Sequence, residues 1–145
     1  MKFLYVAIER QAAELAGFAL RSIAPDVAVS WAAGLGQAKR WVDENRNVSA
    51  LIIEVESDTR SFEALVGHAR SVGVKVPVIG IPLIGTSDVM MSVGTVADEV
   101  VPRNAAFLDE LPKAVGRVLY LTKPQVQQIT LPPRDEPLSR QSRDT

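Results

Sequence analysis

The most constraining stretch of this 145-residue sequence is Ser49–Ser57, which contains an unbroken apolar run, Ala50–Ile53. A strand with one solvent-facing side alternates apolar and polar residues, so a run that does not alternate predicts a central strand covered on both faces. Glu54 and Glu56 follow the run directly. Open parallel sheets place their functional groups beyond the carboxyl ends of the strands, and Glu54 is therefore the first candidate site residue.

Strand-like and helix-like segments alternate along the rest of the chain. The expected strands are Phe3–Ile8, Val27–Trp31, Ser49–Ser57, Val76–Ile81 and Val96–Val101. The expected helices are Gln11–Ile23, Leu35–Asn45, Ser61–Gly73 with Ser61 as the N-cap, Thr86–Met91 and Phe107–Leu119, with Pro112 tolerated only near the start of the last one. This alternation predicts an α/β fold, a doubly wound five-stranded parallel sheet in the flavodoxin-like strand order 2-1-3-4-5.

The composition changes after Leu121. Residues 122–145 contain Pro124, Pro132, Pro133 and Pro137 and end in a polar segment. We expect one α/β domain over residues 1–121, followed by a proline-rich linker or flexible tail over residues 122–145.

Composition excludes several classes of function. The net charge is −1, which predicts no nucleic-acid partner. The chain has no cysteine and one histidine, His68, so neither a thiolate nucleophile nor a multi-histidine metal site is expected. The apolar run at the N-terminus, Met1–Ile8, is too short for a signal peptide or a membrane span, and we expect a cytoplasmic protein with no membrane partner.

Over residues 2–121 this pattern resembles the CheY-like receiver domain of response regulators. The resemblance implies an acidic pair after the first strand, a phosphorylated aspartate after the third, a hydroxyl residue after the fourth and a lysine after the fifth. These positions fall on Ala7 and Ile8, on Glu54, near Pro82 and near Pro102 or Arg103. Because Mg²⁺ requires several oxygen ligands, we expect no metal site and no phosphotransfer.

The succession of segments also resembles the receiver-like N-terminal wing domain of the pyridoxal-phosphate-dependent Orn/Lys/Arg decarboxylases. The segments that carry this resemblance are Ala50–Glu56, Val76–Ile81, Thr86–Val89, Phe107–Leu111 and Ile129–Pro133. It implies a non-catalytic domain that helps to assemble an oligomer, with the cofactor lysine in a later domain. None of the five lysines here follows a histidine, so we expect no enzyme activity and no cofactor.

Two charged residues have alternative interpretations. Glu54 either imitates a phosphorylated state as a permanent negative charge or faces solvent at the end of its strand. Arg103 either pairs with Glu54, as the lysine of receivers pairs with their acidic site, or is an exposed loop residue. His68 is expected at the surface, since no nucleophile accompanies it.

Val89, Met90, Met91 and Val93 form the candidate interface, because adaptable apolar side chains suit protein contacts. Packing of these residues against the sheet is the alternative.

Three functions remain open at this point. The first is a non-catalytic domain of the decarboxylase type, acting in oligomer assembly or regulation. The second is a phosphorylation-independent pseudo-receiver of a two-component system that binds a protein partner. The third is a small flavodoxin-like enzyme or nucleotide binder.

Overall fold

The computed structural model describes residues 1–121. Its internal contacts divide the chain into a unit of Met1–Val115 and a unit that begins at Gly116. The expected linker or tail, residues 122–145, lies outside the described residues. None of the helices in the described part has the length and apolar character that crossing a membrane requires.

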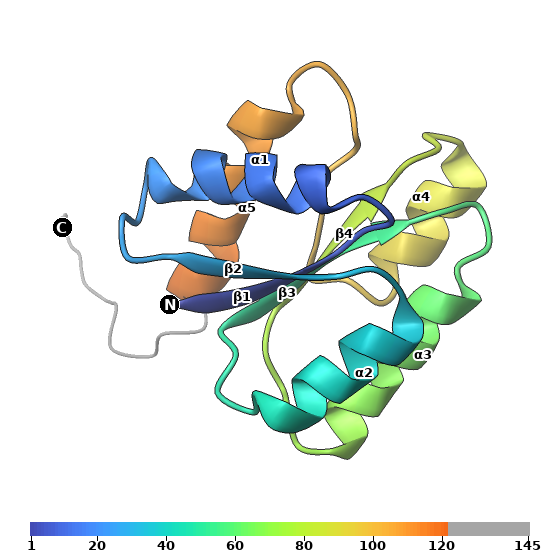
Figure 1. The fold of residues 1–145 in the computed structure, drawn as a ribbon. Coiled ribbons are helices and arrows are strands. Elements are labelled where there is room, and N and C mark those ends of the chain that lie inside the picture. Colours follow the sequence, from blue (N-terminus) through green and yellow to red (C-terminus); the bar gives the residue numbers. More distant parts are fainter. Residues whose placement is uncertain (122–145) are drawn as a thin grey trace, which may run out of the picture. The chain divides into compact units, whose positions relative to one another are not determined.

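Five strands alternate with five helices (Figure 1). In chain order they are β1 (Lys2–Val6), α1 (Arg10–Arg21), β2 (Ala28–Ala32), α2 (Leu35–Glu44), β3 (Ala50–Val55), α3 (Arg60–Ser71), β4 (Val78–Pro82), α4 (Ser87–Gly94), β5 (Glu99–Val100) and α5 (Phe107–Leu121).

All neighbouring strands are parallel, and the sheet order is β2-β1-β3-β4-β5. The predicted strand order is confirmed, and β3 is the central strand. In the register, Tyr5 of β1 lies beside Ile52 of β3, and Glu54 lies beside Ile81 of β4. The carboxyl ends of β1, β3 and β4 therefore meet at one edge of the sheet.

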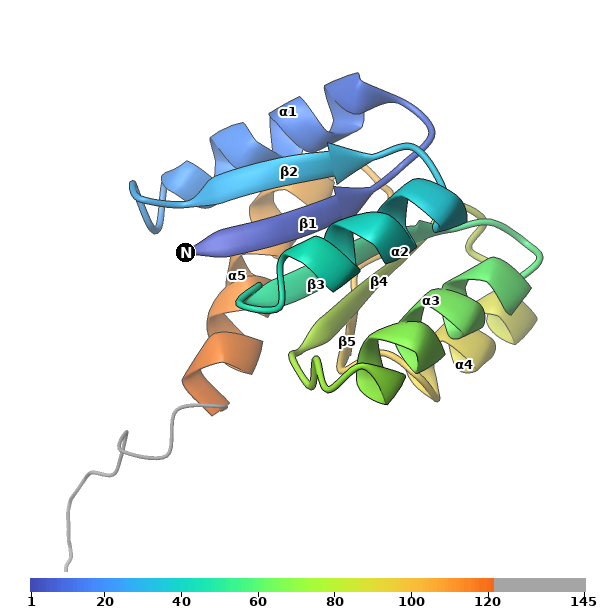
Figure 2. The ribbon, with the colours of Figure 1, turned by 60° about the horizontal axis from the view of Figure 1, so that its bottom comes forward.

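Helices cover both faces of the sheet, which explains the unbroken apolar run in β3. Figures 1 and 2 show α1 and the part of α5 up to Val115 on one face and α2, α3 and α4 on the other. Leu51 and Ile53 belong to the core beneath α2, α3 and α4. Successive strand residues point to opposite faces, so Ile52 and Glu54 point toward α1 and α5. Ile52 is fully buried there.

Gly80 marks a close approach of α4 to β4. A Cβ atom at this position would collide with Cγ1 of Val93, which is fully buried in α4. The valine side chain is stiff at χ1 and packed on all sides, so it has little room to yield. The absence of a side chain at Gly80 therefore allows α4 to pack on the sheet.

Several element boundaries differ from the sequence predictions. The N-cap of helix α3 is Thr59 and not Ser61, two residues earlier than expected. Helix α4 runs on to Gly94, and its N-cap oxygen, Thr86 Oγ1, accepts a hydrogen bond from the Val89 amide at 3.4 Å. Pro112 lies inside α5 rather than only near its start.

Strand β5 is shorter than predicted, with two residues, although its backbone pairing with β4 continues past Val100. The amide of Val101 donates to the Gly80 carbonyl at 3.0 Å, and the amide of Arg103 donates to the Pro82 carbonyl at 3.4 Å. Pro102 lies between them at a position that faces away from β4, so its missing N–H leaves this pairing intact. This continued pairing brings Arg103 to the end of β4.

Candidate functional site

Three side chains from distant parts of the chain meet at the carboxyl edge of the sheet. The Tyr5 hydroxyl of β1 donates a hydrogen bond to Glu54 Oε2 at 2.9 Å. The guanidinium of Arg103, which follows β5, donates from Nη1 to the same oxygen at 2.7 Å. We call these three residues the Glu54 cluster. Both interpretations of Arg103 were open from the sequence, and the structure has the two charged groups in contact.

The three residues of the Glu54 cluster differ in how far their side chains are buried. Tyr5 is fully buried, whereas the Glu54 side chain is 9% exposed and the Arg103 side chain 37% exposed. The pKa of Tyr5 is raised, first by burial and then by the charge and hydrogen bond of Glu54, with Arg103 opposing the shift. Tyr5 is therefore a neutral donor, and Glu54 is the acceptor at the centre of the cluster.

Arg103 is held on both sides. Its backbone is tied to β4 through the Pro82 carbonyl, and its guanidinium lies over the ring of Phe107, 5.0 Å from the centroid. A guanidinium stacked on an aromatic ring loses less freedom when it also binds a carboxylate. The Glu54–Arg103 pair is therefore oriented in advance rather than formed by two free side chains.

The residues at this edge do not fit the magnesium site that a receiver resemblance implies. Ala7 is buried and Ile8 is 67% exposed, and neither side chain has an oxygen atom. Glu54 Oε2 already accepts two hydrogen bonds. Among residues 1–121, no three acidic, histidine or cysteine side chains are grouped so as to hold a metal ion.

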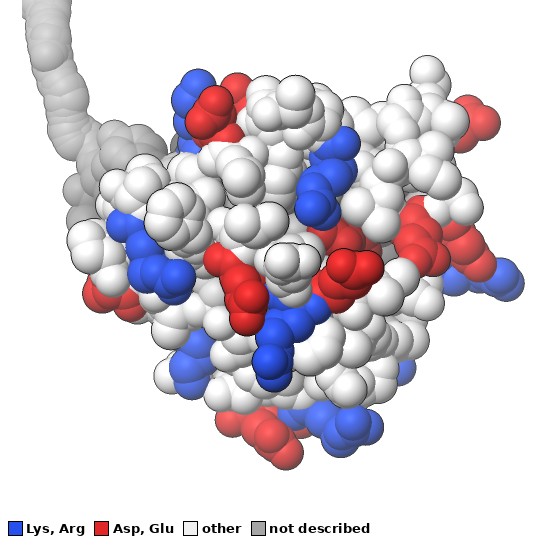
Figure 3. All heavy atoms as spheres, turned by 45° about the horizontal axis from the view of Figure 1, so that its top comes forward, with Lys and Arg blue, Asp and Glu red and all other residues white. Residues whose placement is uncertain are grey.

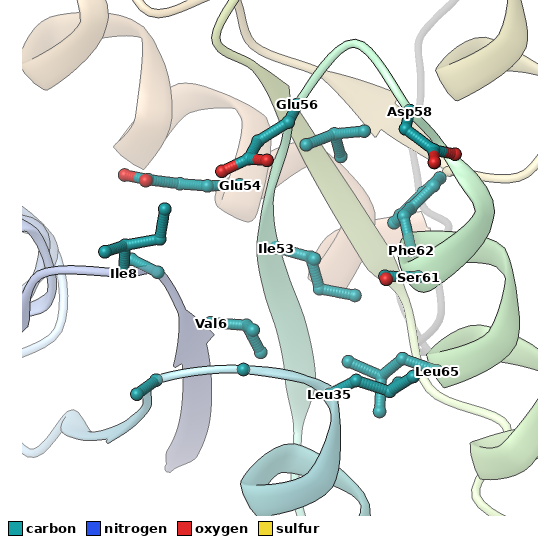
Figure 4. A pocket seen from close by; sticks show the side chains of 14 residues that line it. Val6, Ile8, Leu35, Ile53, Glu54, Glu56, Asp58, Ser61, Phe62 and Leu65 are labelled. Atoms are coloured by element: carbon teal, nitrogen blue, oxygen red, sulfur yellow. The ribbon is translucent and has the colours of Figure 1, made fainter.

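A pocket of about 270 Å³ lies beside the cluster, between the carboxyl ends of β1 and β3. Its floor is apolar and is formed by Val6, Leu35, Ile53, Phe62 and Leu65. Glu56, Asp58 and Ser61 line its outer part, and Figure 4 shows the Glu54 carboxylate turned away from the floor. The Asp58 carboxylate is already bound to the guanidinium of Arg60 at 2.7 Å. The pocket thus combines an apolar floor with carboxylate and hydroxyl groups in its outer part.

The four candidate interface residues on α4 separate into two pairs. Val89 and Val93 are 8% and 0% exposed and pack in the core, so they do not form a contact surface. Met91 is 71% exposed, and Met90 is half-buried. The α4 interface stays a prediction, and it now depends on the two methionines. The sequence could not distinguish the pairs, because all four residues are apolar and adjacent.

Tyr5 is the member of the cluster that sequence reasoning missed. The signal was a tyrosine within the apolar run of β1, since a buried phenol usually finds a hydrogen-bond partner. His68, by contrast, lies on α3 with Nε2 2.8 Å from Asp43 Oδ1, and neither group adjoins the Glu54 cluster.

Charged side chains of both signs are interspersed on the face shown in Figure 3. A nucleic-acid interface requires lysines and arginines gathered on one face or stripe. This view shows no such gathering.

Several solved structures that align with this chain are receiver domains of response regulators. The receiver domain protein from Clostridium thermocellum aligns with a TM-score of 0.69 and 18% identity, over 84% of this chain and 96% of that one. The receiver domain of the Francisella response regulator 1452 aligns with a TM-score of 0.66 and 16% identity, over 84% and 98%. The chain has the receiver fold.

A third structure with the receiver fold holds the P1 domain of CheA3 in complex with CheY6 from R. sphaeroides. It aligns with a TM-score of 0.65 and 15% identity, over 81% of this chain and 95% of that one. No protein-family model and no curated protein matches the sequence. Identities this low establish the receiver fold alone.

Proposed function

We propose that this chain is a non-catalytic receiver-like domain that acts in oligomer assembly or regulation, of the type found at the N-terminus of Orn/Lys/Arg decarboxylases. The observation that carries the proposal is the state of Glu54. This residue takes the place of the phospho-acceptor, and one of its oxygens accepts hydrogen bonds from both Tyr5 and Arg103. The proposal keeps the cytoplasmic location expected from the sequence.

Phosphorylation would require the Glu54 carboxylate to attack a phosphoryl donor whose charge is neutralised by a metal ion. The positions that would supply the metal ligands are Ala7 and Ile8. Attack through Oε2 would also break the ion pair with Arg103 and the hydrogen bond from Tyr5. The cluster therefore favours a permanent charge arrangement over a switch.

Treatment with acetyl phosphate and Mg²⁺, followed by intact-mass spectrometry, tests the non-catalytic part of the proposal. We expect no added phosphoryl group under conditions that modify an active receiver domain in parallel. The variant Glu54→Asp restores the usual acceptor but not the metal ligands, and we expect it to stay unmodified as well. Stoichiometric phosphorylation of the wild-type chain at Glu54 or at any aspartate would overturn this part.

Light scattering coupled to size exclusion tests the assembly part of the proposal. Self-association that depends on protein concentration supports it. If the chain stays monomeric at every concentration, the proposed assembly role is wrong. The resemblance to the decarboxylase wing domain would then imply no role in assembly.

A further inference from the structure

We propose that the pocket between the carboxyl ends of β1 and β3 binds a small apolar amine. The apolar body of this ligand lies on the pocket floor, and its ammonium group meets the Glu56 carboxylate at the mouth. The site goes beyond the proposed assembly function and does not depend on it, because the pocket and Glu56 lie within a single copy of the chain.

The floor of the pocket is apolar and preformed. It is made by Ile53 of β3 and by Phe62 and Leu65 of α3, which are buried core residues, and Leu35 at the start of α2 borders it. Core side chains are held by close packing, so the floor does not have to form when a ligand enters. The volume of about 270 Å³ is that of about nine water molecules, so the pocket suits a ligand of about ten non-hydrogen atoms.

The charge at the mouth of the pocket is negative and unbalanced. The acidic residues Glu54, Glu56 and Asp58 line the pocket, and no lysine, arginine or histidine of the described chain does. Glu54 is paired with Arg103, and Asp58 is paired with Arg60. Glu56 is exposed and has no ion-pair partner among residues 1–121. Its charge is therefore free to pair with a cation that enters the pocket.

The placement of the carboxylates favours an organic cation over a metal ion. Figure 4 shows the Glu56 and Asp58 carboxylates pointing in different directions from the loop between β3 and α3. Within residues 1–121, no three acidic, histidine or cysteine side chains are grouped so as to hold a metal ion, whereas Mg²⁺ and Ca²⁺ require several oxygen ligands. An ammonium group needs one carboxylate and keeps its other hydrogen bonds to water. Because an exposed ion pair is weak, removal of the apolar body from water supplies most of the affinity.

The N-termini of α2 and α3 also border the pocket, and a helix N-terminus attracts anions. In α3 this tendency is met within the chain, since Asp58 Oδ1 accepts a hydrogen bond from the Arg60 amide at 3.0 Å. In α2 the N-cap is Gly34, which has no side chain to accept from the first turn. An amine and a carboxylate that share one apolar body therefore provide the decisive comparison.

NMR titration of the isotope-labelled protein tests the sign of the ligand charge. The probes are phenylpropylamine, phenylpropanol and phenylpropionate, which have the same apolar body and differ in the charge of the end group. We expect saturable shifts of the amides of Gly34, Glu56 and Ser61, with the amine binding most tightly and the carboxylate least tightly. Equal or tighter binding of the carboxylate would overturn the inference. Shifts confined to amides outside the pocket, or no saturable binding of the amine, would overturn it as well.

Butylamine tests the need for the apolar body. It carries the same ammonium group on a short alkyl chain, as a lysine side chain presented by a protein does. We expect it to bind about tenfold more weakly than phenylpropylamine, because it removes less apolar surface from water. Equal affinity of the two amines would mean that the ammonium group alone is recognised, and the proposed ligand class would be wrong.

The variant Glu56→Gln removes the charge at the mouth and keeps the shape of the side chain. We expect phenylpropylamine to bind about threefold more weakly, the effect of an exposed ion pair, and phenylpropanol to bind as before. The matched control is Glu44→Gln, because Glu44 is also exposed and lies at the opposite end of α2 from Gly34. An unchanged amine affinity in Glu56→Gln, or an equal loss in both variants, would overturn the inference. The light-scattering test of the assembly function is independent of these results.

Discussion

Two ion pairs near the carboxyl edge of the sheet have the same length and different surroundings. Glu54–Arg103 and Asp58–Arg60 both join a guanidinium nitrogen to a carboxylate oxygen at 2.7 Å. Glu54 is 9% exposed and also accepts from Tyr5, whereas Asp58 and Arg60 are 57% and 87% exposed. Distance alone does not rank the two ion pairs, because water screens the exposed Asp58–Arg60 pair more strongly than the partly buried Glu54–Arg103 pair.

The largest effect is expected from Arg103→Ala. This change leaves a nearly buried carboxylate with Tyr5 as its remaining partner, and breaking a fully buried pair costs about 3–5 kcal/mol. Because Arg103 is 37% exposed, solvent reduces the loss, and we expect the free energy of unfolding in urea to fall by about 2 kcal/mol. The double variant Glu54→Gln/Arg103→Ala should recover part of the loss. If Arg103→Ala lowered the free energy of unfolding no more than Arg60→Ala does, the Glu54–Arg103 pair would contribute no more to stability than the exposed pair.

A smaller loss is expected from Tyr5→Phe. The change removes one hydrogen bond to Glu54 and leaves the ion pair with Arg103 in place. A hydrogen bond to a charged group contributes about 1.5–3 kcal/mol, but the retained arginine compensates the carboxylate, so we expect about 1 kcal/mol in the same urea experiment. If Tyr5→Phe lowered the free energy of unfolding by more than Arg103→Ala does, Tyr5 and not Arg103 would be the more important partner of Glu54 for stability.

The same tyrosine predicts a dependence of stability on alkaline pH. The pKa of Tyr5 is raised in the folded protein above its ordinary value of 10.0, so the folded state keeps a proton that the unfolded state releases. This contribution to stability is complete below pH 10 and decreases as the pH rises beyond it. Thermal unfolding from pH 8 to 11 should show a steeper decline for the wild type than for Tyr5→Phe. Parallel curves would argue against the buried phenol.

The smallest effect is expected from Arg60→Ala. Hydrogen bonds from Arg60, with a smaller contribution from its charge, lower the pKa of Asp58 from 3.8 to about 2. A lowered carboxyl pKa adds stability above pH 4 and loses it toward pH 2, but this pair is exposed and screened. NMR titration should show the Asp58 pKa rising toward 3.8, while the thermal midpoint at pH 7 stays unchanged. A clear drop in the thermal midpoint at pH 7 would mean that the exposed Asp58–Arg60 pair contributes to stability as the Glu54 cluster does.

The amino-acid sequence by itself determined the order and type of the elements. The apolar run before Glu54 identified β3 as the central strand, and the alternation of segments identified the strand order of the sheet. These features are local, because the periodicity of apolar residues and the interruption of helices and strands by glycine and proline extend over only a few residues. Boundaries were less certain, as Thr59 and the short β5 show.

The tertiary structure decided which distant groups meet. Tyr5 and Arg103 are each 49 residues from Glu54, and they reach one oxygen because the strand register and the crossovers bring three strand ends together. It also decided that Val89 and Val93 turn into the core while Met91 faces outward. Such contacts cannot be predicted from neighbouring residues in the sequence. The rotation of a helix about its axis and the partners of a strand end depend on the packing of the whole domain.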